Sequence, residues 1–261
     1  MTSESILLIG REAGNARDVY EAHARRLDRR TGVDEVEIAT YETEPVRELR
    51  DRFGRVTADR VFAVPMAAAH THHTVDGVPA ALSYVSGSVR YCEPLAGSRA
   101  VTDVIEQRGA ELAPATSDVS LVLVGFGSSS LPYSRQMVDA HADRLREESG
   151  YGEVVTCYLL QNPAVECVRY NVTNERVVAV PLFLSRTEAT EERIPDELEL
   201  DRGNIAYADP LGSHPRVTDA LCDEIDRQRA LALEEGVTAF EGALARAKRP
   251  VATDGEGRPR S

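Results

Sequence analysis

The 261-residue sequence repeats itself, and this internal repeat constrains the fold more than any other feature. Arg60–Pro65 (RVFAVP) returns as Arg176–Pro181 (RVVAVP), and Tyr91–Leu95 (YCEPL) returns as Tyr207–Leu211 (YADPL). Both pairs are separated by the same 116 positions. The same offset relates Val101–Asp103 to Val217–Asp219. Agreement at a constant offset predicts two homologous halves.

Each half alternates short apolar stretches with amphipathic ones. In the first half this pattern predicts strands at 5–9, 36–41, 60–65 and 89–93, with helices at 15–30, 45–53 and from Pro79, and the order recurs from Ser120. Alternation with short connections predicts an α/β fold in which each half is a parallel sheet flanked by helices. Ligands of such sheets bind beyond the carboxyl ends of the strands, so we expect the active cleft between the two halves.

Composition shifts set the expected boundaries. We expect an N-terminal half over 1–109, a linker over 110–118 with polar turns around Pro114, and a C-terminal half over 119–248 that includes a terminal helix. Residues 249–261 hold Gly, Pro and charged residues with almost nothing apolar, which is typical of a disordered tail.

The charge balance excludes several classes of partner. Asp and Glu (43) outnumber Lys and Arg (30), the formal net charge is −13, and Lys248 is the only lysine. This balance argues against a nucleic-acid partner. No apolar run is long enough for a membrane span and the start lacks a signal-peptide pattern, so we expect a cytoplasmic protein that does not engage a membrane. The acidic, lysine-poor composition also resembles that of halophilic proteins, because salt screens self-repulsion.

Three of the six histidines follow the third predicted strand, in His70-Thr-His72-His73. Neutral imidazole is a common ligand of late first-row metals and also titrates near neutrality, so this loop suits metal binding or proton transfer. A solvated loop is the alternative. Glu42 and Glu44 follow the second strand at the same sheet edge, where a carboxylate could share a metal or a proton with an imidazole.

Other candidate motifs are weaker. Gly125-Phe-Gly-Ser-Ser-Ser130 could be a phosphate cradle or carry a serine nucleophile, but it matches neither motif, and a strand-to-helix turn with a serine cap is favoured. His23 and His141 occupy equivalent positions among alanines, which favours a structural role. His214 follows a strand end and could face the cleft.

Arg176–Ser185 (RVVAVPLFLS), Glu192–Pro195 (ERIP) and Asp209–Pro215 (DPLGSHP) together resemble the CbiX-type sirohydrochlorin cobaltochelatases, which are class II tetrapyrrole chelatases. The resemblance spans both halves, over about 5–225. It implies insertion of a divalent metal, Co²⁺ or in relatives Fe²⁺ or Ni²⁺, into sirohydrochlorin, with no organic cofactor.

The resemblance also implies roles for individual residues. The family has a Gly-His-Gly-Ser loop after the first strand, a glutamate after the second and a histidine after the third. The glutamate falls on Glu42 and the histidine on His73, with His70 and His72 as additional metal ligands, so His73 and Glu42 are the expected catalytic pair. Arg11 replaces the first-strand histidine.

Substrate carboxylates are the expected partners of the cationic residues. Arginine cannot ligate a cation while it is protonated, so Arg11 would instead bind a carboxylate of the polyacidic tetrapyrrole. Arg186 and His214 are further substrate-binding candidates, and Arg193 could act likewise, although surface arginines that compensate an acidic protein are the alternative. In the second half, Phe126 and Ala189 stand where the family has histidines.

Metal insertion removes two pyrrole protons, so the site needs a base with a pKa of roughly 6 to 7 and weak, exchangeable ligands. Imidazole and carboxylate meet both needs. The competing hypothesis is a divergent relative that binds metal or tetrapyrrole without turnover. The sequence leaves open which metal is used and whether the protein is a monomer or a homodimer.

Overall fold

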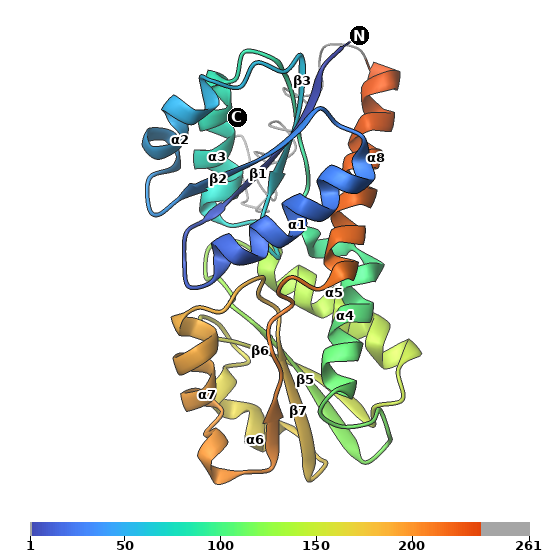
Figure 1. Cartoon of the computed structure of the whole chain (residues 1–261). Helices are drawn as coiled ribbons and strands as arrows, with labels where there is room; N and C mark the ends of the chain where they lie inside the picture. Colours follow the sequence, from blue (N-terminus) through green and yellow to red (C-terminus); the bar gives the residue numbers. More distant parts are fainter. Residues whose placement is uncertain (1, 236–261) are drawn as a thin grey trace, which may run out of the picture.

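The computed structural model describes residues 2–235; the predicted tail and the end of the predicted terminal helix lie outside this range. The first half has four strands and four helices in alternation (Figure 1). Their bounds are β1 (Glu4–Arg11), α1 (Ala16–Thr31), β2 (Glu35–Tyr41), α2 (Pro45–Phe53), β3 (Arg60–Pro65), α3 (Val78–Ala81), β4 (Ser88–Tyr91) and α4 (Arg99–Ala110).

The second half repeats this order. Its elements are β5 (Val119–Gly125), α5 (Tyr133–Glu148), β6 (Glu153–Tyr158), α6 (Val168–Asn171), β7 (Arg176–Pro181), α7 (Ile194–Glu197), β8 (Ile205–Tyr207) and α8 (Pro215–Glu235). A π-helical turn precedes α3 and another precedes α7. These turns span His73–Gly77 and Ala189–Arg193. The repeat detected in the sequence therefore extends to irregular features of the backbone.

Both sheets are parallel and have the same strand order, β2-β1-β3-β4 and β6-β5-β7-β8. β1 lies at the centre of its sheet, and its register pairs Arg11 with Tyr41 and Ile9 with Pro65. The central strands β1 and β5 are almost wholly buried because parallel sheets are covered on both faces. These findings confirm the predicted fold class of two homologous α/β halves.

The last helix of each half packs on the other half. α8, the final described helix of the second half, contacts α1, β3 and β4 of the first half. α4, the final helix of the first half, contacts β7 and α5 of the second. Figure 1 shows α8 beside the upper sheet and α4 beside the lower one. The two halves thus exchange their last helices, which the sequence did not indicate.

This exchange joins the halves through one continuous core. A single apolar cluster contains Ile6 and Leu8 of β1, Leu121 of β5, Val104 of α4 and Leu221 of α8. The opposite faces of the two sheets have separate cores, one under α2 and α3 and the other under α6 and α7. Within the described part of the chain, the helices are too short or too polar to cross a bilayer.

Candidate functional site

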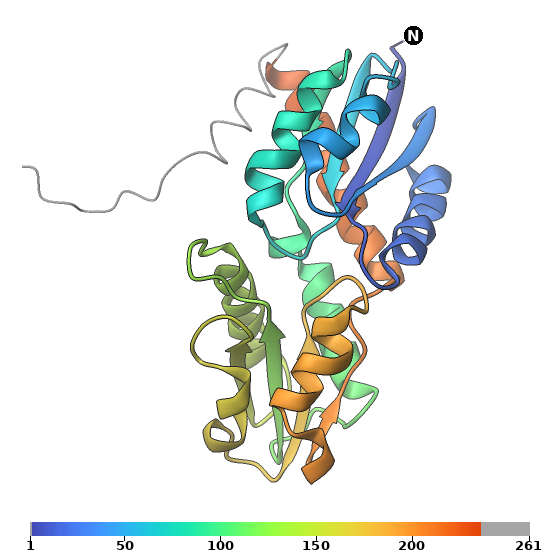
Figure 2. The same cartoon turned by 90° about the vertical axis from the view of Figure 1, so that its left-hand side faces the viewer.

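The loops that follow β1 and β3 meet those that follow β5 and β7 (Figure 2). The backbone N–H of Arg186 donates to Asn15 Oδ1 (2.7 Å), and the N–H of Asn15 donates to the Arg186 carbonyl (3.3 Å). Gly14 lies at this contact with φ +53°, and a Cβ there would lie 1.8 Å from the Arg186 carbonyl oxygen. The carboxyl edges of the two sheets therefore face each other, as the fold class predicts.

Arg11 and Glu42 lie together because β1 and β2 are adjacent and in register. Arg11 Nε donates to the Glu42 backbone carbonyl at 3.0 Å. The Glu48 carboxylate accepts the backbone N–H groups of Glu42 (2.6 Å), Thr43 (3.0 Å) and Glu44 (2.6 Å). These hydrogen bonds lower the pKa of Glu48. They also fix the turn after β2, which leaves the Glu42 side chain exposed at the sheet edge.

His73 lies over the same edge. Its ring packs edge-on against Tyr41, the last residue of β2, with 5.3 Å between ring centroids. Partial burial lowers the pKa of His73, and the neighbouring Arg11 cation lowers it further. Burial raises the pKa of Tyr41 to about 12. At neutral pH, His73 is therefore an uncharged imidazole that can bind a metal ion or accept a proton.

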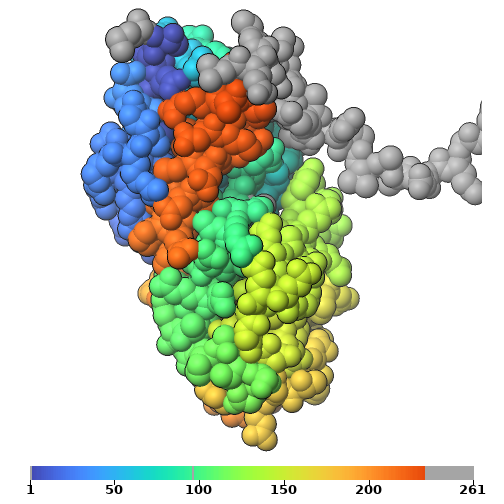
Figure 3. Space-filling view, turned by 90° about the vertical axis from the view of Figure 1, so that its right-hand side faces the viewer, coloured from blue at the N-terminus to red at the C-terminus, as the bar shows by residue number. Residues whose placement is uncertain are grey.

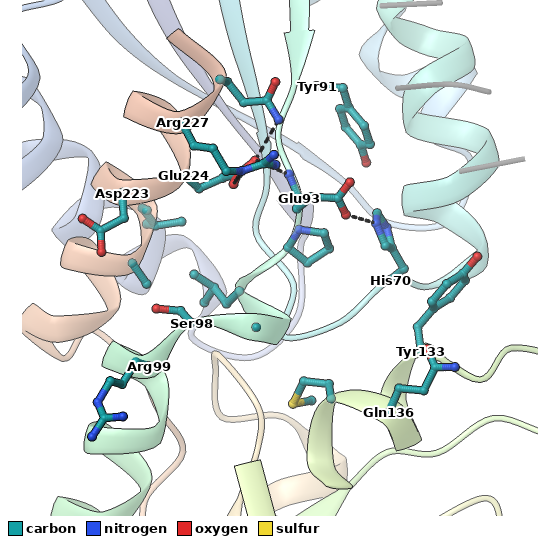
Figure 4. A pocket seen from close by; sticks show the side chains of 17 residues that line it. His70, Tyr91, Glu93, Ser98, Arg99, Tyr133, Gln136, Asp223, Glu224 and Arg227 are labelled. Atoms are coloured by element: carbon teal, nitrogen blue, oxygen red, sulfur yellow. Dashed lines mark hydrogen bonds and ion pairs between the residues drawn. The ribbon is translucent and has the colours of Figure 1, made fainter. Parts of the chain in front are cut away.

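His70 turns to a different partner. Its Nε2 lies 2.8 Å from Glu93 Oε2, just beyond β4, and its Nδ1 lies 3.2 Å from Thr74 Oγ1. The His70 ring also packs edge-on against Tyr133, at the start of α5. Figure 4 shows His70 and Glu93 pointing toward each other at the margin of a cavity of about 780 Å³, which residues from both halves line.

His72 points across to the second half, where its Nε2 lies 2.9 Å from Ser130 Oγ. The neighbouring Ser128 Oγ accepts the backbone N–H groups of Ser130 (3.3 Å) and Leu131 (3.1 Å). These hydrogen bonds close a turn between β5 and α5, as expected, but the expected serine cap is absent, because α5 begins after Pro132 without a side-chain cap.

The three histidines among the four predicted metal ligands thus point in different directions. Among residues 2–235, no three His, Cys, Asp or Glu side chains are grouped as the ligands of one ion would be. The structure brings His73 together with the edge that carries Glu42 and Arg11, and it directs His70 and His72 to Glu93 and Ser130.

The remaining substrate-binding candidates lie apart from His73. Arg186 Nη2 donates to Asp209 Oδ1 (2.7 Å) at the facing edge, and Arg193 contacts Glu197 (3.4 Å). His214 lies at the start of α8, where it accepts the backbone N–H of Arg216 (3.2 Å). Burial and the nearby Arg108 of α4 lower the pKa of His214. Its surroundings are therefore helical, and the structure does not bring it to the histidine loop.

The second half carries an aromatic residue, Phe126, where the first half carries Arg11. Phe126 follows β5 as Arg11 ends β1, and its ring packs edge-on against Phe183 at 6.2 Å. Phe126 is 45% exposed. Sequence reasoning missed three contributors to the site, namely Tyr41, Glu48 and Glu93. The position of Tyr41 and Glu93 at or just beyond strand ends was the available signal, whereas Glu48 lies in the first turn of α2.

Geometry and topology define the class of protein: a duplicated α/β protein whose two parallel sheets meet at their carboxyl edges, with a titratable cluster at one edge. The model of the family described as CbiX matches residues 6–112 and again 120–228. The chain therefore belongs to the CbiX family.

Individual relatives agree with this assignment. The chain is 24% identical over 251 residues to the "Probable sirohydrochlorin cobaltochelatase" of Halobacterium salinarum, covering 80% of this chain and 85% of that protein. It is 31% identical over 136 residues to the "Sirohydrochlorin cobaltochelatase" of Methanopyrus kandleri, covering 41% of this chain and 94% of that protein. The structure of SirB from Bacillus subtilis with Fe³⁺ superposes with a TM-score of 0.71 at 21% identity, over 90% of this chain and 99% of SirB. The two curated relatives are named as cobaltochelatases, and the SirB structure has the same fold as this chain.

Proposed function

We propose that this protein inserts a divalent metal ion, with Co²⁺ as the expected ion, into sirohydrochlorin. The observation that carries the proposal is the position of His73, a neutral imidazole at the sheet edge that also holds Glu42 and Arg11. Family membership and the names of the curated relatives support the reaction and the metal.

The proposed chemistry divides the work among three residues. His73 and Glu42 bind the incoming ion with one nitrogen and one carboxylate, leaving positions for water and for the pyrrole nitrogens that replace it. Such an open, weak site can release its metal, whereas four protein ligands would retain it. Once the metal has moved to the ring nitrogens, the freed His73 imidazole accepts one of the two pyrrole protons and the freed Glu42 carboxylate accepts the other.

Arg11 serves the substrate side of the proposed reaction. Its Nε is taken by the Glu42 carbonyl, which leaves the two Nη groups to meet a carboxylate of the tetrapyrrole. Its charge also keeps the pKa of His73 low, after the larger effect of burial. The Arg11 guanidinium therefore favours both the binding of the polyacidic tetrapyrrole and the neutral form of His73.

The test is to mix the purified protein with sirohydrochlorin and Co²⁺ and to follow metallation by the change in the absorption spectrum. We expect His73→Ala to slow metallation about 100-fold, since a positioned base contributes at least that much. Glu42→Gln should slow it as well. Glu44→Gln is the matched control, because Glu44 is exposed and pairs only loosely with Arg47 (3.6 Å). Unchanged metallation by His73→Ala would refute the assignment.

One observation favours a second candidate, a relative that binds tetrapyrrole or metal without turnover. Arg11 replaces the family histidine after β1, and no three-ligand group is found among the described residues. The same assay separates the two candidates. A spectrum that reports bound but unmetallated tetrapyrrole would establish the binder, and repeating the assay with Fe²⁺ and Ni²⁺ defines the metal.

A further inference from the structure

We infer that His70 and Glu93 form a positioning pair that holds the loop carrying His73, and that His70 is not a ligand of the metal. The inference rests on the proposed function only for the role of His73. Equivalent contacts occur at matching positions of the two halves.

In the first half, the pair is part of a small network around Thr74. His70 Nε2–H donates to Glu93 Oε2 (2.8 Å). Thr74 Oγ1 accepts the Thr71 N–H (2.8 Å), and the Tyr91 hydroxyl donates to the Thr74 carbonyl (2.6 Å). The network ties both sides of His73 to β4 and the residues after it.

The second half contains the same network 116 positions later, with both residues of one contact replaced. The Thr187 N–H donates to Thr190 Oγ1 (2.9 Å), and the Tyr207 hydroxyl donates to the Thr190 carbonyl (3.0 Å). At the position of the His70–Glu93 contact, Arg186 Nη2 donates to Asp209 Oδ1 (2.7 Å). A basic side chain therefore meets a carboxylate at the same place in both halves.

In the second half, the Arg186–Asp209 contact has a role that does not depend on a metal ion. Arg186 cannot ligate a cation while protonated, and Ala189 stands at the position of His73. The two copies share the shape of the loop, including the π-helical turn that follows. The simplest common role is therefore to hold this turn against the end of the fourth strand.

The surroundings of His70 agree with this role. Its side chain is only 12% exposed, and both ring nitrogens lie within hydrogen-bond distance of protein oxygens. Glu93 is held in turn, because its backbone N–H donates to Glu224 Oε1 of α8 (2.8 Å). Figure 4 shows this chain of contacts running from α8 through Glu93 to His70. The exchanged helix thus supports the loop that presents His73.

The decisive variant is His70→Arg, which installs the residue of the second half. Amide hydrogen exchange of residues 71–77 is measured on the metal-free protein. We expect His70→Ala and Glu93→Gln to speed exchange in this segment about tenfold or more, and His70→Arg to restore protection, because local opening follows the loss of local contacts. Arg186→Ala is the matched variant and should speed exchange only around 187–193. The thermal midpoint of each variant verifies that it is folded.

Co²⁺ titration provides the second measurement. Loss of a supporting contact weakens metal binding about 10- to 100-fold, so His70→Ala should bind Co²⁺ less tightly and His70→Arg should recover most of the affinity. If His70 were a ligand, His70→Arg would bind as poorly as His70→Ala. Exchange in His70→Arg as fast as in His70→Ala would also overturn the inference. Absent metallation by the wild type would refute the proposed function alone, since exchange is measured without metal or substrate.

Discussion

The convergence of three candidate site residues, Arg11, Glu42 and His73, follows from the topology of the first sheet. The first three strands end at one sheet edge, so residues just beyond them must be neighbours, and the sequence predicted this much. The directions of three nearby imidazoles could not be predicted, because they depend on the backbone of one short turn. His70, His72 and His73 turn to Glu93, Ser130 and Tyr41 respectively.

The Arg11 cation should extend metal binding to lower pH. Its removal in Arg11→Gln eliminates one cause of the lowered pKa of His73, so that pKa should rise. More His73 is then protonated at a given acidic pH, and Co²⁺ binding should be lost at a higher pH than in the wild type. Co²⁺ titration between pH 5 and 8 measures the shift. Arg17→Gln is the control, because Arg17 is exposed and pairs with Glu12 (3.3 Å). A midpoint that stays in place or falls would contradict the prediction.

At the scale of elements, the alternation of strands and helices along the chain follows from the sequence, whereas the exchange of α4 and α8 does not. The repeat has the same offset whether each last helix covers its own sheet or the other one. Two buried histidines mark the exchanged contacts: His23 of α1 lies 2.9 Å from Thr218 of α8, and His141 of α5 lies 2.8 Å from Thr102 of α4. The structural role expected for both histidines is therefore specific. Each histidine joins an exchanged helix to a helix of the other half.

These two histidines should make the fold sensitive to mild acid. Burial lowers the pKa of both His23 and His141 to about 4, against 6.5 for a free imidazole. These histidines therefore take up protons in the unfolded chain first as the pH falls. By pH 5, each histidine should lower the free energy of unfolding by about 2 kcal/mol. The urea midpoint should fall between pH 7 and 5, before most carboxylates are protonated.

The double variant His23→Gln, His141→Gln tests this assignment. Its stability should depend on pH much less over that interval, whatever its absolute stability. His72→Gln, an exchange at an exposed position, should keep the wild-type slope. Equal slopes for the double variant and the wild type would mean that other groups cause the acid sensitivity.

At the scale of the whole molecule, the halves recognised in the sequence are not independent packing units. The face of the first sheet that carries Ile6 and Leu8 is covered by α1 and by α8, which comes from the far end of the described chain. Figure 3 shows α8, in orange-red, lying against the blue first half. A sheet face without its helix exposes a large apolar surface to water.

A fragment of residues 1–118 should therefore not fold alone. It contains all four strands of the first sheet but lacks α8, and it should show no cooperative urea transition by circular dichroism. Mixing it with a fragment of residues 119–261 should restore the native spectrum and a single transition. A cooperative transition in the isolated first fragment would show that α8 is dispensable.

The net charge of −13 leads to a prediction of its own. Most ion pairs among the described residues are exposed, for example Arg99–Glu148 and Arg176–Asp118, so they contribute little. Salt should then stabilise the protein, because it screens more repulsion than attraction. We expect the thermal midpoint to rise by several degrees between dilute buffer and 2 M KCl, as about 1 kcal/mol shifts the midpoint of a protein of this size by about 2–4 °C. A midpoint that falls with salt would contradict this expectation.

The helix exchange also bears on how the two halves came to differ. Two single-repeat chains that traded their last helices would form a symmetric dimer, in which every substitution appears twice, on both facing edges. Joining the copies in one polypeptide removes that coupling without disturbing the shared core. One edge could then keep His73 while the other acquired Ala189 and Phe126. Fusion thus allows a division of labour that a homodimer cannot encode.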